Sequence, residues 1–333
     1  MSRDPVVTPQ SPIAVQVWTP PVAAEVAGAL TSFLQHKGSP WIEDIARRLA
    51  GGLAGATDYF YAALRDGQLV GHAWYTVARA APQVGLVGHI FTHPAHRRQG
   101  IAAHLLARIV QDFAQRGGQL LQLFTSTAYS VPFYQRLGFE NLCVGRAYHD
   151  TDWYMRAPAG SAPLVNDWYT APAVAQRRLT AADLPQYCLL YNSEHDSQLK
   201  DRAQRVGSGL EAEMAFIEAT AACAAGQALC LVQENSRVLI GTATLVRSTF
   251  PYESHVAMFD YYVHAAHGAS ALELGDACLA ARSELGTEVI YAVASEADKC
   301  QVLTALGFAP CGDLPGHYRT GHTCFSARLF RWS

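Results

Sequence analysis

A repeat within the chain limits the folds that this sequence can adopt. Residues 126–139 (STAYSVPFYQRLGF) and residues 295–308 (SEADKCQVLTALGF) both follow an apolar run and both end in Leu-Gly-Phe, 169 residues apart. Residues 64–75 and residues 232–245 share a strand–turn–strand pattern at nearly the same offset. The first of these turns contains Asp-Gly, a strong hairpin signal. A nearly constant offset across two different motifs indicates a tandem duplication.

Each copy alternates apolar strand patterns with amphipathic helix patterns. In the first copy we expect helices near 21–36 and 41–53, a hairpin at about 58–80, a strand at 85–92, a helix at about 100–116, a strand at 119–125 and a helix at 130–137. Such alternation predicts an α/β fold with a mixed sheet in each half. Gly71 and Gly241, 170 residues apart, are expected to be equivalent positions.

A segment rich in proline, glycine and alanine divides the two copies. It reads APAGSAP at residues 157–163, a composition typical of a linker. We therefore expect a flexible N-terminal tail at 1–14, a first domain at 15–157, a linker at 158–172 and a second domain at 173–333.

The composition excludes several classes of protein. Apolar residues make up 50% of the 333 residues and the net charge is −3, so the chain is expected to be globular and not to bind nucleic acid. No run of about 18 apolar residues predicts a transmembrane helix, and the polar N-terminus lacks the apolar segment of a signal peptide. The eight cysteines form no C-x-x-C pair and most lie in apolar runs. We expect reduced thiols in a cytoplasmic protein that does not bind membranes.

The segment at residues 85–106 (GLVGHIFTHPAHRRQGIAAHLL) carries the strongest chemical signal. It reads as a strand, a proline, a basic turn and an amphipathic helix. The N-terminus of a helix presents unpaired N–H groups and the positive end of its dipole, and Gly100 allows a phosphate to approach the backbone closely. Arg97 and Arg98 add fork-shaped donors. The pattern predicts an anion site, and the alternative is an ordinary turn with solvated arginines.

Together these segments resemble the GNAT (N-acetyltransferase) superfamily. The acyl-CoA loop of that family, R/Q-x-x-G-x-G/A, is matched by Arg97-Arg98-Gln99-Gly100-Ile101-Ala102. The later family signature, N-x-x-A-x-x-F/L-Y-x-x-x-G-F, corresponds to Thr127, Ser130, Phe133, Tyr134, Gly138 and Phe139. Thr127 replaces the usual Asn and Ser130 replaces Ala. The resemblance covers roughly residues 15–155.

The resemblance implies an acetyl-CoA site in the first half. Backbone N–H groups from Arg98 to Ala102 would bind the pyrophosphate, and the strand edge ending at Thr92 would pair with the pantetheine amides. Tyr134 would protonate the leaving thiolate as a general acid, or else pack on the sheet. The implied cofactor-binding residues are Ile90, Phe91, Thr92, Arg97, Arg98, Gln99, Gly100, Ile101, Ala102, Thr127, Ser130 and Phe133.

The residue that takes the proton from the amine is less defined by the sequence. Many family members use a carboxylate on the long strand, and this strand has none. Its only titratable side chain is His89, which either acts as the catalytic base or packs within the sheet. Glu43, Asp44 and Asp58 could line the amine pocket, or they could be solvated carboxylates.

The second half has lost the motif residues. The acyl-CoA loop corresponds to Ala266–Ala271, which contains no arginine, and Tyr134 corresponds to Leu303, which cannot donate a proton. Glu296 replaces Thr127. We expect a degenerate copy that keeps the fold but does not bind acetyl-CoA.

Two other groups of polar residues have weaker signals. Glu194 and Asp196 of the second half could attract a cationic amine, or they could belong to a solvated loop. The clustered histidines of residues 89–104 and the C-x5-H-x4-H-x-C pattern of residues 311–324 match no trusted metal-ligand spacing, so no metal is expected.

The sequence thus predicts an acyltransferase of the GNAT type. It would transfer the acetyl group of acetyl-CoA, its co-substrate, directly to a primary amine of a small molecule, with Tyr134 as general acid. The alternatives are a protein or peptide N-acetyltransferase and a non-catalytic regulatory protein that senses CoA. The chain would act as a monomer, whose halves form an internal pseudo-dimer, or as a homodimer.

Overall fold

The computed structural model describes residues 11–144, 153–193, 199–207, 212–320 and 323–332. The strands of the first half are β1 (Ala14–Trp18), β2 (Ala56–Arg65), β3 (Gln68–Ala78), β4 (Ala81–Thr92), β5 (Leu120–Thr125), β6 (Glu140–Val144) and β7 (Trp153–Ala157). Those of the second half are β8 (Ala173–Arg178), β9 (Leu199–Asp201), β10 (Val206–Gly207), β11 (Ala228–Asn235), β12 (Leu239–Arg247), β13 (Val256–Val263), β14 (Val289–Ala294), β15 (Phe308–Thr320) and β16 (Thr323–Trp332). The helices are α1 (Ala24–Phe33), α2 (Trp41–Gly51), α3 (Ile101–Gln115), α4 (Val131–Gln135), α5 (Ala162–Trp168), α6 (Leu184–Tyr191), α7 (Ala212–Ala224), α8 (Ser270–Ala280) and α9 (Ala297–Ala305).

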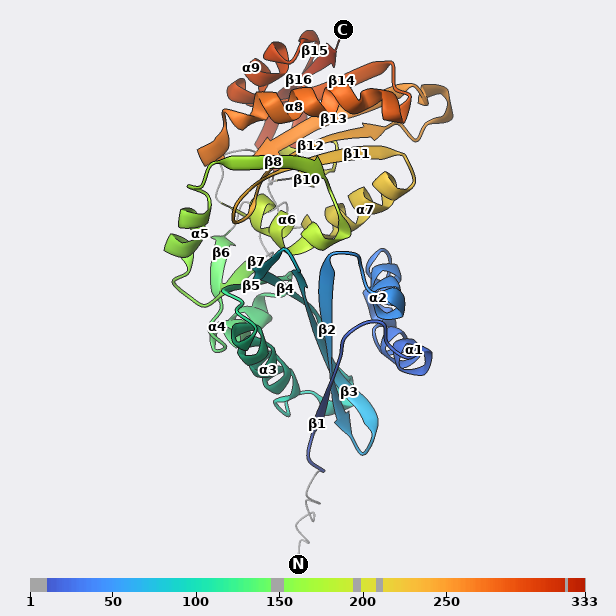
Figure 1. Ribbon diagram of the computed structural model, residues 1–333, viewed down its shortest axis with the longest axis vertical. Helices are drawn as coiled ribbons and strands as arrows, with labels where there is room; N and C mark the ends of the chain where they lie inside the picture. Colours follow the sequence, from blue (N-terminus) through green and yellow to red (C-terminus); the bar gives the residue numbers. More distant parts are fainter. Residues whose placement is uncertain (1–10, 145–152, 194–198, 208–211, 321–322, 333) are drawn as a thin grey trace, which may run out of the picture.

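Two seven-stranded sheets repeat one strand order (Figure 1). The first runs β1-β2-β3-β4-β5-β7-β6, and the second runs β8-β11-β12-β13-β14-β16-β15. In each sheet one parallel pair, β4–β5 or β13–β14, lies among antiparallel pairs. The mixed α/β fold and its tandem duplication are thereby confirmed.

The two halves share one continuous core. Helices α3 and α4 pack on one face of the first sheet, and α8 and α9 pack on the outer face of the second. The other face of the first sheet carries α1 and α2, and α6 and α7 of the second half lie between the two sheets (Figure 1). Trp74 of the first sheet, Tyr187 of α6, Phe216 of α7 and Val232 of the second sheet belong to a single buried cluster. The second half therefore borders the first sheet directly.

The segment expected to be a linker contains a short helix. Helix α5 occupies Ala162–Trp168, and Val165, Trp168 and Tyr169 are buried in the shared core. Residues 158–161 form no helix or strand, as expected of a linker. The apolar side chains that follow them are buried between the two halves. Of the expected N-terminal tail, residues 11–14 are described, and Ala14 already begins β1. Among the described helices, none is long and apolar enough to cross a lipid bilayer.

Gly71 and Gly241 occupy equivalent places under a helix. A Cβ atom on Gly71 of β3 would lie 2.5 Å from Cγ2 of Ile101, the first residue of α3. A Cβ atom on Gly241 of β12 would lie 3.1 Å from Leu274 of α8. In both halves the glycine lets the helix pack closely on the sheet.

We expect the substitution Gly71→Ala to destabilise the protein by about 1–3 kcal/mol, because the added methyl group must displace Ile101 and the start of α3. Gly28→Ala is the matched control, since Gly28 lies in α1 with nothing near its Cβ position, and there alanine should be neutral or favourable. Denaturant unfolding of both variants measures the difference. Equal stability of Gly71→Ala and the wild type would contradict the close packing of α3 on β3.

Candidate active site

A cavity of about 1120 Å³ runs along β4 of the first half. Its walls come from β4, the turn before α3, the segment around α4, the turn after α1 and the start of α7. It brings together the predicted residues His89, Ile90, Phe91, Thr92, Arg97, Arg98, Gly100, Ile101, Ala102, Thr127, Ser130, Phe133 and Tyr134. Gln99 is the exception, because its side chain accepts a hydrogen bond from Nη1 of Arg65 at 2.6 Å outside the cavity.

Strand β4 contains a bulge at the centre of the cavity. His72 of β3 pairs with Phe91, whereas Trp74 pairs with Gly88, so three steps along β4 oppose two steps along β3. His89 lies within the bulge at φ +52. His72 Nδ1 donates a hydrogen bond of 2.9 Å to the backbone oxygen of His89. Burial lowers the pKa of His72 to about 4, so this buried ring stays neutral while it holds the bulge.

The edge of β4 beyond the bulge is open. Strand β4 pairs with β5 only from Val84 to Leu86. From there to Thr92, none of the described strands pairs with this edge. Unpaired backbone N–H and C=O groups on a strand edge can bind an extended ligand that carries amides.

The turn before α3 forms an anion cradle. Four residues, 97–100, separate the turn Pro94–His96 from α3, and two of them have positive φ: Arg98 at +62 and Gly100 at +78. A Cβ atom on Gly100 would meet nothing within 4 Å, so the space beside this backbone is free for a ligand. The first N–H groups of a helix have no partners within the helix, and such groups at the start of α3 can bind a phosphate.

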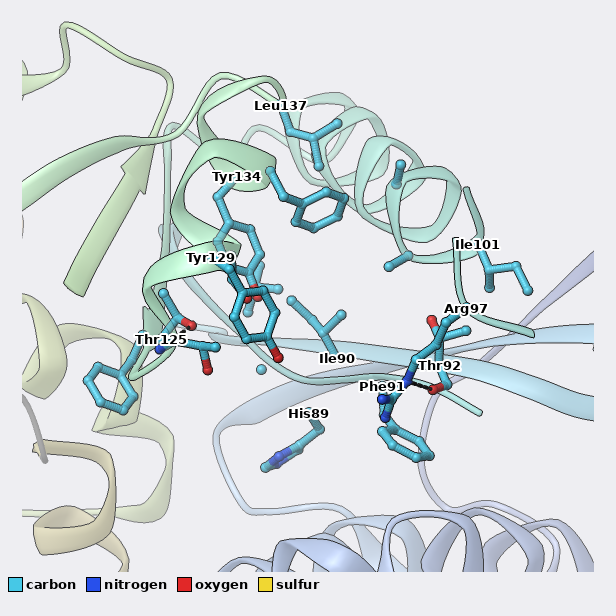
Figure 2. Close-up of a pocket in the computed structure, with 18 of the residues that line it drawn as sticks. His89, Ile90, Phe91, Thr92, Arg97, Ile101, Thr125, Tyr129, Tyr134 and Leu137 are labelled. Atoms are coloured by element: carbon cyan, nitrogen blue, oxygen red, sulfur yellow. Dashed lines mark hydrogen bonds between the residues drawn. The ribbon is translucent and has the colours of Figure 1, made fainter. Parts of the chain in front are cut away.

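Tyr134 points into the cavity from α4. Figure 2 shows it beside Tyr129 on one side of β4. Its side chain is 8% exposed, and burial raises the pKa of Tyr134 to about 12. The phenol is therefore protonated at neutral pH and available as a proton donor.

His89 has a different environment. Its ring is 7% exposed and stacks on Trp74 with 4.7 Å between ring centroids. In Figure 2 it points to the other side of β4 from Tyr134. Burial, together with the charge of Lys37, holds the pKa of His89 well below its usual range. A ring that resists protonation in this way is a weak proton acceptor, so the catalytic role of His89 stays a prediction.

The carboxylates suggested for the amine pocket lie elsewhere. Asp44 and Asp58 are buried in an ion-pair network around Arg48, with 2.9 Å between Arg48 Nη1 and Asp58 Oδ1. Trp74 Nε1 also donates to Asp58 at 2.9 Å. Glu43 is exposed on α2. None of these three carboxylates is on the cavity wall, and Glu194 and Asp196 lie outside the described residues.

Two charged residues on the cavity wall were missed by the sequence analysis. Lys37 ends the turn after α1, and Glu213 is the second residue of α7 in the other half of the chain. Burial raises the pKa of Glu213 to about 7, against the opposing effect of Lys37, and burial lowers the pKa of Lys37. No spacing pattern links these residues, because their proximity depends on how the halves pack.

The corresponding region of the second copy is built differently. Strand β13 pairs with β12 without a register shift from Ala257 to Val263, so the bulge is missing there. Only two residues precede α8 after its short turn, and both have negative φ. Lys299 Nζ of α9 forms an ion pair of 2.6 Å with Asp260 of β13, and Leu303 is buried in the core.

The described part of the chain offers no candidate metal site. Among the described residues, no three His, Cys, Asp or Glu side chains are grouped so that they could hold a metal ion. His322 of the C-terminal Cys/His pattern lies outside the described residues.

Part of the first half is similar to a known family. Residues 29–139 match the model of the acetyltransferase (GNAT) family. No curated protein matches the sequence significantly. Similar solved structures include yncA from Salmonella typhimurium with its cofactor acetyl-CoA (18% identity, TM-score 0.42, 48% of this chain and 92% of that chain). Others are ribosomal-protein-alanine N-acetyltransferase from Brucella melitensis (22%, 0.40, 47% and 98%) and a variant of spermidine N-acetyltransferase SpeG from Vibrio cholerae (16%, 0.38, 47% and 91%). Residues 29–139, a third of the chain, are thus similar to the acetyltransferase (GNAT) family.

Proposed function

We propose that the first half binds acetyl-CoA and transfers its acetyl group directly to a primary amine of a small molecule. The observation that carries this proposal is that one cavity joins the anion cradle before α3, the open edge of β4 and the phenol of Tyr134. In the proposal, residues 15–157 are the catalytic domain, and residues 173–333, after a connection at 158–172, are a degenerate copy.

Each part of the cavity has a role in the proposed reaction. The backbone from Arg98 to Ala102 holds the pyrophosphate, and the edge of β4 from Ile90 to Thr92 pairs with the pantetheine amides. The thioester supplies an already activated acyl group, so no covalent enzyme intermediate is needed. Tyr134 holds a proton close to the position of the thiolate, and the bulge frees backbone N–H groups for the oxyanion.

The shape of the cavity supports a small acceptor over a peptide. The acceptor end, beside His89, is bounded by Lys37 of the first half and Glu213 of the second. Because Glu213 at the start of α7 lines the cavity, the second half forms part of its wall, which supports a compact acceptor over a long peptide. The presence of Tyr134 supports an enzyme over a CoA sensor, which needs no proton donor.

Calorimetric titration with acetyl-CoA, followed by a thiol-release assay with a panel of amines, tests the proposal. We expect one site per chain and release of CoA that depends on an amine. Two sites would show that the second half also binds, although the turn before α8 is short and lacks positive φ angles. Absence of binding would refute the proposal, and binding without turnover for every amine and peptide would favour a sensor.

A further inference from the structure

The acceptor end of the cavity holds two opposite charges that the proposed function leaves unassigned. Lys37 and Glu213 both line the cavity, and each is the largest charged influence on the pKa of the other. Both side chains therefore lie on the wall of one cavity. Within the described part of the chain, however, no ion pair of 4.0 Å or less joins them.

Of the cations that act on Glu213, Lys37 is the one that forms no ion pair among the described residues. Arg48 also faces Glu213, but it is bound by Asp44 and by Asp58. Asp44 adds negative charge. Two neutral groups of the interior also lie near the carboxylate: the Cys188 thiol and the Tyr154 phenol, whose pKa values are both raised by burial and by Glu213.

Few negative charges lie near Lys37. Its ammonium faces His36, His72 and His89, and its charge contributes to the lowered pKa of each ring. The only anion that acts on Lys37 among the described residues is Glu213. Two partly buried charges that do not contact each other carry a desolvation cost that a ligand with complementary charges would offset.

We propose that the acceptor is a zwitterion of the amino-acid type, whose ammonium group lies at Glu213 and whose carboxylate lies at Lys37, and that Glu213 receives the ammonium proton. This inference rests on the proposed function and adds the substrate class to it. A polyamine or an aminoglycoside fits less well, because its additional ammonium groups would lie near Lys37, and Glu213 is the one carboxylate among the described residues that line the cavity.

The proposed transfer moves one proton through Glu213 and one through Tyr134. Glu213 takes one proton from the ammonium group, and the free amine nitrogen forms a bond with the acetyl carbon. The carbon–sulfur bond breaks, and the thiolate takes the proton of Tyr134. The resulting phenolate regains a proton from the acylated nitrogen, so that the amide and CoA thiol leave. Glu213 then releases its proton to water.

The proposal also gives the degenerate half a function. Strand β4 contains no carboxylate, and helix α7 of the second half supplies one to the cavity wall from across the shared core. The second half would then be retained for one wall of the acceptor site.

Matched acceptors test the substrate class. With acetyl-CoA saturating, kcat/KM is measured for amino acids, for the corresponding amino-acid amides and for polyamines. We expect the acids to be preferred over their amides at least tenfold, and the variant Lys37→Met to lose most of this preference through a higher KM for the acids. Faster turnover of amides or polyamines, or an unchanged preference in Lys37→Met, would overturn the inference and leave the acetyl transfer itself standing.

A pH profile tests the proton acceptor. A carboxylate with a pKa of about 7 must lose its proton to act, so kcat should rise with pH through this region in the wild type. Glu213→Gln should lower kcat at pH 7 at least tenfold and remove this limb, with the dissociation constant of acetyl-CoA unchanged. Glu218→Gln, an exposed position on the same helix, is the control and should match the wild type. A limb that persists in Glu213→Gln would refute the role of Glu213, whereas lack of turnover with every acceptor would refute the proposed function itself.

Discussion

Replacement of Tyr134 by phenylalanine should lower kcat for acetyl transfer by about 10²- to 10³-fold, the range expected when a general acid is removed. The phenol is buried on the cavity wall, and its raised pKa keeps it protonated. Phenylalanine fills the same volume against the rings of Phe133 and Phe139, which lie 5.1 and 6.2 Å from the ring of Tyr134. Calorimetry should therefore give a dissociation constant for acetyl-CoA close to that of the wild type.

Tyr129 provides the matched control for this substitution. It lines the same cavity on the same side of β4, but it is 86% exposed (Figure 2). Tyr129→Phe should keep kcat within a few-fold of the wild type. If Tyr134→Phe also retained its rate, the phenol would be an aromatic packing residue and another donor would have to protonate the thiolate. If both variants lost acetyl-CoA binding, the segment around α4 would be a binding element.

Those parts of the fold that depend on local sequence could be predicted. The helix expected at about 100–116 is α3, Ile101–Gln115, because its apolar periodicity and the glycine at its start are contained in one short segment. The repeat predicted two copies, and the matching strand orders confirm them. The predicted acyl-CoA residues meet at one cavity for the same reason, since the two motifs flank neighbouring strands.

The remaining features depend on packing between distant segments. The sequence suggested Asp44 and Asp58 for the amine pocket, but no pattern shows that Arg48 binds both. The bulge of β4 depends on its register with β3, which a single strand sequence does not fix. Glu213 reaches the cavity because α7 packs against the first half, so its position could not be read from the second half alone.

Replacement of Gly100 by tryptophan should weaken acetyl-CoA binding by at least about 100-fold, because the side chain would project into the space where the N–H groups of the turn meet the pyrophosphate. A Cβ atom at this position meets no protein atom within 4 Å, so the clash would be with the ligand and not with the fold. The positive φ of +78 adds a strain of about 1–2 kcal/mol for a residue other than glycine. The measurement is calorimetric titration, with thermal unfolding measured in parallel.

Gly117 makes this experiment decisive, because it lies just beyond the other end of α3 in nearly the same conformation. Its φ is +84, a Cβ atom there also meets nothing within 4 Å, and it does not line the cavity. Gly117→Trp should therefore have the same strain and a similar loss of thermal stability, but it should bind acetyl-CoA like the wild type. Equal loss of binding in both variants would assign the effect of Gly100→Trp to folding, and normal binding in Gly100→Trp would move the pyrophosphate away from the turn before α3. Loss in Gly100→Trp alone would localise the pyrophosphate at this turn, and since the second copy has neither the positive φ angles nor the length of the turn, it would also account for a single site per chain.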